Sequence, residues 1–221
     1  MGGESAIAVA LSFIEELRSR LALPLPGVTA QARMAPQPRT VPPLMKTEEE
    51  AVPSAVLILL FRKDGNWSFF LTERSHSVEY HPGQLSLPGG AQEDDEPLET
   101  TALRETEEEI GVSPGVVTLL GELTTLFIPV SGFRVHPFVG WSNGELETAI
   151  DETEVAALHA IEMSALLNDS LVGRELRTIR GVDVDVPFFH FGELKVWGAT
   201  AAILSECKDV FADCFELEKM L

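Results

Sequence analysis

Three glutamates near the middle of the chain have the spacing of ligands on one helix face. Glu105, Glu108 and Glu109 stand at i, i+3 and i+4, so a helix would hold their carboxylates within an arc of about 100°. Like charges at this spacing destabilise an isolated helix by about 0.2–0.5 kcal/mol per pair. Hard divalent cations prefer oxygen ligands and would offset this repulsion. By itself the pattern favours a solvated acidic face, with a divalent-metal site as the alternative.

The helix that carries these glutamates has clear ends. Pro97 suits the first helical position, where a missing N–H costs nothing, and Gly111 suits a C-terminal cap. The pattern predicts a helix over residues 97–110, with Leu103 and Ile110 on its buried side. Arg104 is placed to pair with a carboxylate one turn further on. Glu107 falls outside the arc and has no expected chemical role.

The remaining elements predict an α/β protein. Ala6–Leu21 has the apolar spacing of an amphipathic helix, and a Pro-rich passage follows that is expected to be irregular and to wrap the domain. We therefore divide the chain into an N-terminal helix and Pro-rich arm over 1–50 and a main domain over 51–221. The predicted strands are Ala55–Phe61, Trp67–Thr72, Val116–Leu126, Phe133–Trp141 and Val186–Phe191, and the later predicted helices are Met163–Leu167 and Ala199–Phe211.

Charge and composition narrow the possible partners. The 221 residues carry a formal net charge of -19, which repels nucleic acid and anionic membrane surfaces. An anionic small substrate would need local cations, and bound divalent metals would supply them. Cys207 and Cys214 match no zinc pattern and are expected to be buried thiols of one helix. No secretory signal is apparent over residues 1–23, so a cytoplasmic location is expected.

The segment from Gly90 to Val112 resembles the signature of the Nudix hydrolase family. The matching residues, in register, are Gly90, Glu96, Arg104, Glu105, Glu108, Glu109, Gly111 and Val112. The resemblance implies a Nudix α/β/α sandwich with a mixed β-sheet, here with an extra N-terminal helix and Pro-rich arm. It also implies that Glu105, Glu108 and Glu109 hold Mg²⁺ or Mn²⁺, with the Gly90 carbonyl as a further ligand. Arg104 and Glu96 would support them.

A second resemblance, upstream, is to the coenzyme A pyrophosphatase subfamily. It rests on residues 70–75, on Gly83-Gln84 and on residues 87–90, and weaker likenesses occur at 137–139 and 196–201. It implies hydrolysis of CoA or acyl-CoA to 3′,5′-ADP and (acyl-)4′-phosphopantetheine, with Arg74 as a substrate contact. Two positions depart from that pattern, because Glu79 stands where the subfamily has Arg and Leu87 where it has Phe.

The general base is less clearly marked. A carboxylate on a downstream segment could deprotonate the attacking water, and the acidic passage at Glu152 and Glu154 is suitably placed. We favour Glu154, with Glu105 and an ordinary solvated charge run as alternatives. The histidines at 76, 81, 136 and 190 show no metal-ligand spacing and are expected to be structural.

Three rival functions remain at this stage. A nucleotide-sensing Nudix module would be expected to lose metal carboxylates, and all three are present. An isomerase of isoprenoid diphosphates would need an active-site cysteine, whereas both cysteines lie in the predicted C-terminal helix. A Nudix hydrolase of ADP-ribose, NADH or nucleoside diphosphate sugars is the serious competitor. The N-terminal helix could fold back on its own domain or exchange with a second copy, so a homodimer stays open.

Overall fold

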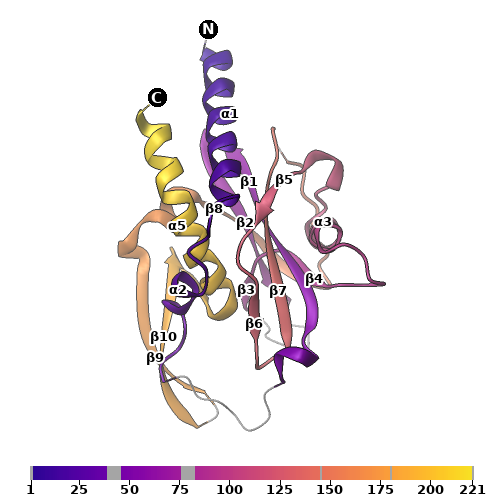
Figure 1. The fold of residues 1–221 in the computed structure, drawn as a ribbon, viewed down its shortest axis with the longest axis vertical. Helices are drawn as coiled ribbons and strands as arrows, with labels where there is room; N and C mark the ends of the chain where they lie inside the picture. Colours follow the sequence, from indigo (N-terminus) through magenta and orange to yellow (C-terminus); the bar gives the residue numbers. More distant parts are fainter. Residues whose placement is uncertain (1, 39–45, 76–82, 145, 180, 221) are drawn as a thin grey trace.

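The computed structural model describes residues 2–38, 46–75, 83–144, 146–179 and 181–220, and Figure 1 shows their arrangement. The helices are α1 (Gly2–Leu21), α2 (Gly27–Ala32), α3 (Leu98–Ile110), α4 (Met163–Leu167) and α5 (Gly198–Met220), with short 3₁₀ turns at Glu48–Glu50, Pro114–Val116 and Asp169–Leu171. The strands are β1 (Val52–Lys63), β2 (Asn66–Arg74), β3 (Leu85–Ser86), β4 (Gly89–Ala91), β5 (Thr118–Glu122), β6 (Leu126–Ile128), β7 (Phe133–Trp141), β8 (Val155–Glu162), β9 (Val172–Ile179), β10 (Val182–Phe191) and β11 (Leu194–Trp197).

A mixed sheet forms the centre of the fold. Its main path runs β3-β2-β1-β7-β5, while β4 pairs with β1, β6 with β7 and β8 with β2. The β1–β2 hairpin turns at Asp64 and Gly65, which both have positive φ, as a two-residue hairpin loop requires. The parallel pair β1–β7 brings two distant segments together at the sheet centre. These pairings confirm the predicted α/β class.

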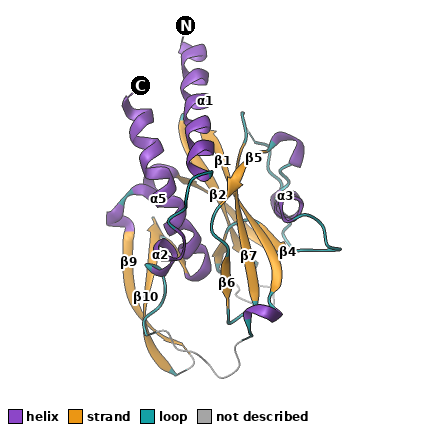
Figure 2. Cartoon of the chain, viewed as in Figure 1, coloured by secondary structure: helices purple, strands orange, loops and turns teal. Residues whose placement is uncertain are grey.

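Two core clusters cover the opposite faces of this sheet. On one face, α3 packs on apolar side chains of β1, and Leu57, Leu59 and Ala102 are fully buried there. On the other face lie α1, α5 and the separate sheet β11-β10-β9, with Leu17 and Phe211 in the larger cluster. Figure 2 shows α3 apart from the other long helices, across the sheet strands. The fold is therefore layered, and α3 stands alone on its side.

The structure corrects several predicted boundaries. The strand expected over Val116–Leu126 is two short strands, β5 and β6, because the chain leaves the sheet between them and Leu123 donates to the Pro137 carbonyl. Pro97 is the cap before α3 rather than its first residue, since its ψ of 139° is extended. In contrast, Phe133–Trp141 and Met163–Leu167 have the predicted bounds. The strands β3, β4, β8, β9 and β11 were not predicted.

The N-terminal arm is tied to the C-terminal helix. The expectation of an irregular Pro-rich passage is wrong for Gly27–Ala32, which form α2 directly after Pro26, because proline is compatible with a helix start. The fully buried Glu206 of α5 accepts from the Gly27 N–H at 3.1 Å and from the Gln31 amide at 2.9 Å. The arm shares its core with the main domain. The predicted domain boundary at residue 50 stays a prediction.

Two smaller expectations concern the helices. Cys207 and Cys214 are both free thiols buried in α5, as predicted. Burial raises the pKa of the Cys207 thiol above its ordinary value, so it is held in its neutral form. Among the helices of the described segments, none has the length and apolar character that crossing a membrane requires.

Candidate active site

The carboxylate helix lies against the short strand β4. Antiparallel pairing sets Gly90 opposite Ala55 of β1, and α3 packs on both strands. Gly111 ends the helix in the left-handed conformation, at φ 73°, and its N–H donates to the Glu107 carbonyl. The predicted burial pattern is partly wrong. Glu109, expected on the carboxylate face, is buried, because the helix turns one flank of that face towards β4.

Arg104 is the centre of an ion-pair network. Its Nη2 donates to Glu96 Oε1 at 2.9 Å and to the Ala91 carbonyl at 3.2 Å. Its Nη1 donates to Glu108 Oε2 at 2.8 Å and lies 3.0 Å from Glu105 Oε1. The Glu96 contacts raise the pKa of Arg104 above its ordinary value, and Arg104 in turn lowers that of Glu96. One guanidinium therefore joins three carboxylates and the end of β4: the predicted partner one turn further on, Glu108, and in addition Glu105 and Glu96.

Glu109 is the most deeply buried acidic group of the site. Only 4% of the residue is exposed, and its carboxylate accepts a long, 3.3 Å hydrogen bond from the Gly89 N–H. Burial raises the pKa of Glu109 to about 8, while the Gly89 hydrogen bond and the charge of Arg74 act in the opposite direction. Burial also raises the pKa of Glu105, with Arg104 opposing it. Glu109 is therefore a buried anion with weak local compensation, which creates a demand for positive charge.

Gly90 is a glycine for a steric reason. A Cβ built at this position would overlap the carboxylate of Glu105, so only a residue without a side chain lets the helix approach β4. The neighbouring Gly89 has φ 149°, and a Cβ there would overlap the Ala55 carbonyl. Gly90 therefore allows the close approach of the Glu105 carboxylate to β4, and Gly89 allows the close approach of β4 to β1.

We expect Gly90→Ala to lower kcat/KM by about 100-fold, because an error of about 1 Å in a catalytic group costs that order of magnitude. The fold should survive, since Gly90 is not at positive φ and the overlap is with one side chain. Steady-state kinetics and thermal unfolding on the same preparation check this. Gly115, whose added Cβ meets only Ser113 Oγ at 3.9 Å, provides the matched Gly→Ala control. Unchanged kinetics in Gly90→Ala would show that Glu105 is not positioned by this contact.

The structure also brings Arg74 and Glu154 to this region. Arg74 is the last residue of β2 and pairs in register with Val155, directly after Glu154. The Arg74 charge acts on Glu109, and the Glu154 charge acts on both Glu105 and Glu109. Both predicted residues therefore lie within electrostatic reach of the carboxylate helix. Glu152 is exposed in the turn before them. Glu79, the departure from the subfamily pattern, lies outside the described residues.

The donor set suits a divalent cation. Carboxylate and carbonyl oxygens are the preferred ligands of Mg²⁺ and Mn²⁺, and the buried Glu109 charge is poorly compensated. Within the segments that the structure describes, no three acidic, histidine or cysteine side chains converge closely enough to hold an ion as they stand. Arg104 accounts for this, because it pairs with Glu105 and Glu108. The residues fit a metal, and binding would require these two side chains to turn from Arg104.

Sequence reasoning missed contacts made by the backbone and by polar side chains of the sheet. The Gly89 N–H and the Ala91 carbonyl join β4 to Glu109 and Arg104, and only the Leu-Pro-Gly-Gly pattern before β4 hinted at such a close approach. His136 was expected to be structural, and its ring is paired with the carboxylate of Glu122 on β5, a contact that the sequence did not predict. Since pairing across strands depends on register, the sequence spacing carries no signal for it.

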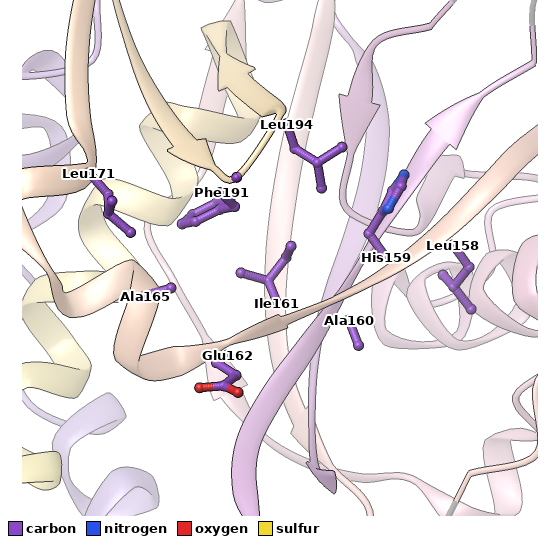
Figure 3. A pocket seen from close by; sticks show the side chains of 10 residues that line it. Leu158, His159, Ala160, Ile161, Glu162, Ala165, Leu171, Phe191 and Leu194 are labelled. Carbon is purple, nitrogen blue, oxygen red and sulfur yellow. The ribbon is translucent and has the colours of Figure 1, made fainter. Parts of the chain in front are cut away.

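A separate pocket of about 440 Å³ lies between β8, α4 and the turn joining β10 to β11. Figure 3 shows His159 and Ile161 on one side of β8, with Leu158 and Ala160 on the other. Ile161 and Phe191 of its lining belong to the core cluster on the face away from α3. The pocket is therefore not part of the carboxylate site.

A mixed sheet carries a glutamate-rich helix on one face. This helix packs against a Gly-Gly strand and ends at a glycine cap, and the combination defines the class of protein. The family model described as the NUDIX domain matches residues 51–180, and the chain belongs to this family as a Nudix hydrolase.

The curated relatives include two informative examples. An "Uncharacterized Nudix hydrolase NudL" of Enterobacter sp. (strain 638) is 37% identical over 154 residues, covering 69% of this chain and 79% of the relative. "Nudix hydrolase 15, mitochondrial" of Arabidopsis thaliana is 33% identical over 181 residues, covering 77% of this chain and 63% of the plant protein. The chain therefore spans less than two thirds of the plant relative.

Among solved structures, the Nudix hydrolase RenU from M. Smegmatis aligns with a TM-score of 0.50 at 16% identity, covering 73% of this chain and 87% of that one. A MutT/nudix family protein from Enterococcus faecalis aligns with a TM-score of 0.50 at 17% identity, covering 79% and 66%. At these identities the likeness concerns the fold, and it agrees with the predicted Nudix architecture.

Proposed function

We propose that the chain hydrolyses the diphosphate bond of CoA or acyl-CoA in the presence of Mg²⁺ or Mn²⁺. The observation that supports the proposal is that Arg74, the cation of the CoA-type upstream element, ends β2 within electrostatic reach of the buried Glu109 of the carboxylate helix. A cation at this place can contact the phosphate groups of a substrate whose diphosphate lies at the helix. The substrate class is thus a nucleoside diphosphate derivative that ends in a pantetheine arm.

Each side chain is assigned a role from its position in the site. Glu105, Glu108 and Glu109, with the Gly90 carbonyl, would hold the divalent ion. A bound ion would neutralise the diphosphate charge and lower the pKa of a coordinated water. Arg104 would orient Glu105 and Glu108 through the contacts described above.

Hydrolysis requires one proton acceptor. Water oxygen attacks one phosphorus, the bond from that phosphorus to the bridging oxygen breaks, and the electron pair of that bond stays on the departing phosphate. The water proton passes to a carboxylate, and we propose Glu154, which is exposed and acts electrostatically on both Glu105 and Glu109. The products are 3′,5′-ADP and (acyl-)4′-phosphopantetheine.

A hydrolysis panel tests this assignment. CoA, acyl-CoA, ADP-ribose, NADH and diadenosine polyphosphates are each incubated with enzyme and Mg²⁺ or Mn²⁺, and the products are separated by chromatography. We expect CoA or acyl-CoA to give the highest kcat/KM, and Glu108→Gln to lose about 100-fold or more, because a metal ligand supports several kcal/mol of transition-state stabilisation. Glu107→Gln, on the exposed side of the same helix, is the matched control.

The panel has three informative outcomes. Preferred turnover of ADP-ribose, NADH or a dinucleotide would contradict the CoA assignment and retain diphosphate hydrolysis. No turnover of any substrate would favour a nucleotide-sensing module. If Glu107→Gln and Glu108→Gln lose activity equally, the proposed division of the helix into a metal face and a solvent face is wrong.

A further inference from the structure

A second polar pair lies on the same face of the sheet as the carboxylate helix. His136 Nδ1 is 2.7 Å from Glu122 Oε1, and the Thr125 hydroxyl lies 3.4 Å from the same nitrogen. The His136 side chain is 21% exposed and that of Glu122 is 39% exposed. The pair is therefore held in place by the sheet and is still open to a ligand.

Strand register places this pair beside the site. Gly90 pairs with Ala55, and Ala55 pairs with His136, so the three residues form one row across β4, β1 and β7. Ala55 belongs to the core cluster under α3, and residues paired in register point to the same face. Adjacent strands are about 4.8 Å apart, so the Cα atoms of Gly90 and His136 are about 10 Å apart. This is a distance that one nucleotide can span.

The contact with Glu122 fixes what the imidazole offers to a ligand. With the proton on Nδ1 donated to Glu122, the neutral ring has a lone pair on Nε2. Because Nδ1 is turned towards β5 and β6, the opposite ring edge faces β1 and β4. Within the described residues, nothing is hydrogen-bonded to Nε2. The pair therefore presents hydrogen-bond acceptors: Nε2 of His136 and the carboxylate of Glu122.

An aromatic side chain lies next to these acceptors. Phe127 of β6 pairs in register with Arg134 of β7, one row beyond His136. Its neighbours Leu126 and Ile128 point into the core on the opposite face, so the half-buried Phe127 ring lies on the face of α3. An aromatic face beside a set of acceptors suits a flat heterocycle that carries an amino group.

We infer that His136, Glu122 and Phe127 form the subsite for the adenine of the substrate. The inference rests on the proposed function, because it takes the nucleoside half of the diphosphate as the occupant. The adenine amino group is a hydrogen-bond donor and can donate to the Glu122 carboxylate, which His136 orients through its Nδ1. Hypoxanthine has a carbonyl oxygen at that position, which would face the Glu122 carboxylate. The subsite therefore selects adenine over hypoxanthine.

Binding of the product tests the subsite without catalysis. The probes are adenosine 3′,5′-bisphosphate and inosine 3′,5′-bisphosphate, titrated by calorimetry into the full chain with Mg²⁺. We expect the adenosine form to bind about 10-fold more tightly or better, because a site built to pair with a polar group rejects the analogue that lacks it. Glu122→Gln and His136→Gln should each reduce the preference to about 2-fold. Thermal unfolding of both variants checks the fold.

His159 provides the matched control. It forms the same kind of pair, with Nε2 3.1 Å from Glu73, on the opposite face of the sheet. His159→Gln should leave the adenine preference unchanged. Equal binding of both probes by the unmodified protein, or an adenine preference that survives Glu122→Gln and His136→Gln, would overturn the subsite.

The two proposals fail separately. If CoA is not hydrolysed but the adenine preference is present and lost in Glu122→Gln, the subsite stands and the CoA assignment is wrong. If CoA is hydrolysed and neither bisphosphate is preferred, the proposed function stands and the subsite is wrong.

Discussion

Replacing Glu109 with Gln should stabilise the metal-free protein and abolish its response to divalent ions. The carboxylate is almost fully buried, and burial raises its pKa to about 8, so at neutral pH folding must either protonate it or bury a charge. The neutral amide has neither cost. A pKa difference of one unit corresponds to about 1.4 kcal/mol, so the gain near pH 8 should be of the order of 2–4 kcal/mol.

The pH dependence of this gain has a defined sign. Since the folded pKa of Glu109 lies above the ordinary value of 4.5, its protonated form favours the fold at low pH, and that contribution is lost as pH rises towards 8. The difference in unfolding free energy between Glu109→Gln and the unmodified protein should therefore be small below pH 4.5. It should grow up to about pH 8 and then level off. Denaturant unfolding at several pH values, with a chelator present, measures this difference.

Divalent ions should narrow or remove the stability difference between Glu109→Gln and the unmodified protein. At a concentration 100 times its Kd, Mg²⁺ or Mn²⁺ would add about 2.7 kcal/mol to the unmodified protein, which corresponds to about 5–10 °C in Tm. Glu109→Gln should gain little, and its activity should fall by about 100-fold or more. Glu107→Gln, exposed on the same helix, should respond to the ions like the unmodified protein. An equal Tm rise in Glu109→Gln would show that this carboxylate is not a ligand.

The part of the site that the sequence predicts is the part that lies on one helix. Helical spacing alone places Glu105 and Glu108 together and pairs Arg104 with Glu108, and both hold in the structure. The burial of Glu109 could not be predicted in this way. It depends on β4 lying over one flank of α3, and that position is set by the pairing of Gly90 with Ala55, 35 residues earlier in the chain.

One of the strands that the sequence did not reveal has side chains that are weak strand formers. Residues 155–162 read Val-Ala-Ala-Leu-His-Ala-Ile-Glu, an alanine-rich stretch with low β-propensity, yet they form β8 because β2 offers an unpaired edge. Leu176 of β9 is 78% exposed, so the alternation that marks a half-buried strand is missing there. By contrast, β7 alternates along Val135, Pro137 and Val139, and its bounds were predicted. Tertiary pairing therefore decides the elements that local pattern leaves open.

The largest loss of activity without loss of ion binding is expected from Arg104→Ala. The 22% exposed guanidinium joins Glu96, Glu105 and Glu108, and its removal leaves three carboxylates that repel one another. Removing one partner of a fully buried pair costs about 3–5 kcal/mol, and partial exposure should reduce this to about 1–3 kcal/mol for the metal-free protein. Arg104→Lys keeps the charge and loses the planar fork, so it should restore stability more than activity.

Divalent ions distinguish two roles of Arg104: it either competes with the ion for Glu105 and Glu108 or holds these ligands in place for it. Because Arg104 occupies Glu105 and Glu108 in the metal-free protein, its removal frees both carboxylates for an ion. Mg²⁺ should therefore raise the Tm of Arg104→Ala by more than it raises that of the unmodified protein, while kcat/KM falls by about 100-fold or more through lost orientation. A smaller Tm rise than in the unmodified protein would mean that Arg104 preorganises the ligands instead of competing for them. Arg174→Ala, which removes an arginine paired with Asp185 on the separate β11-β10-β9 sheet, is the control for the loss of one cation from a protein with a net charge of -19.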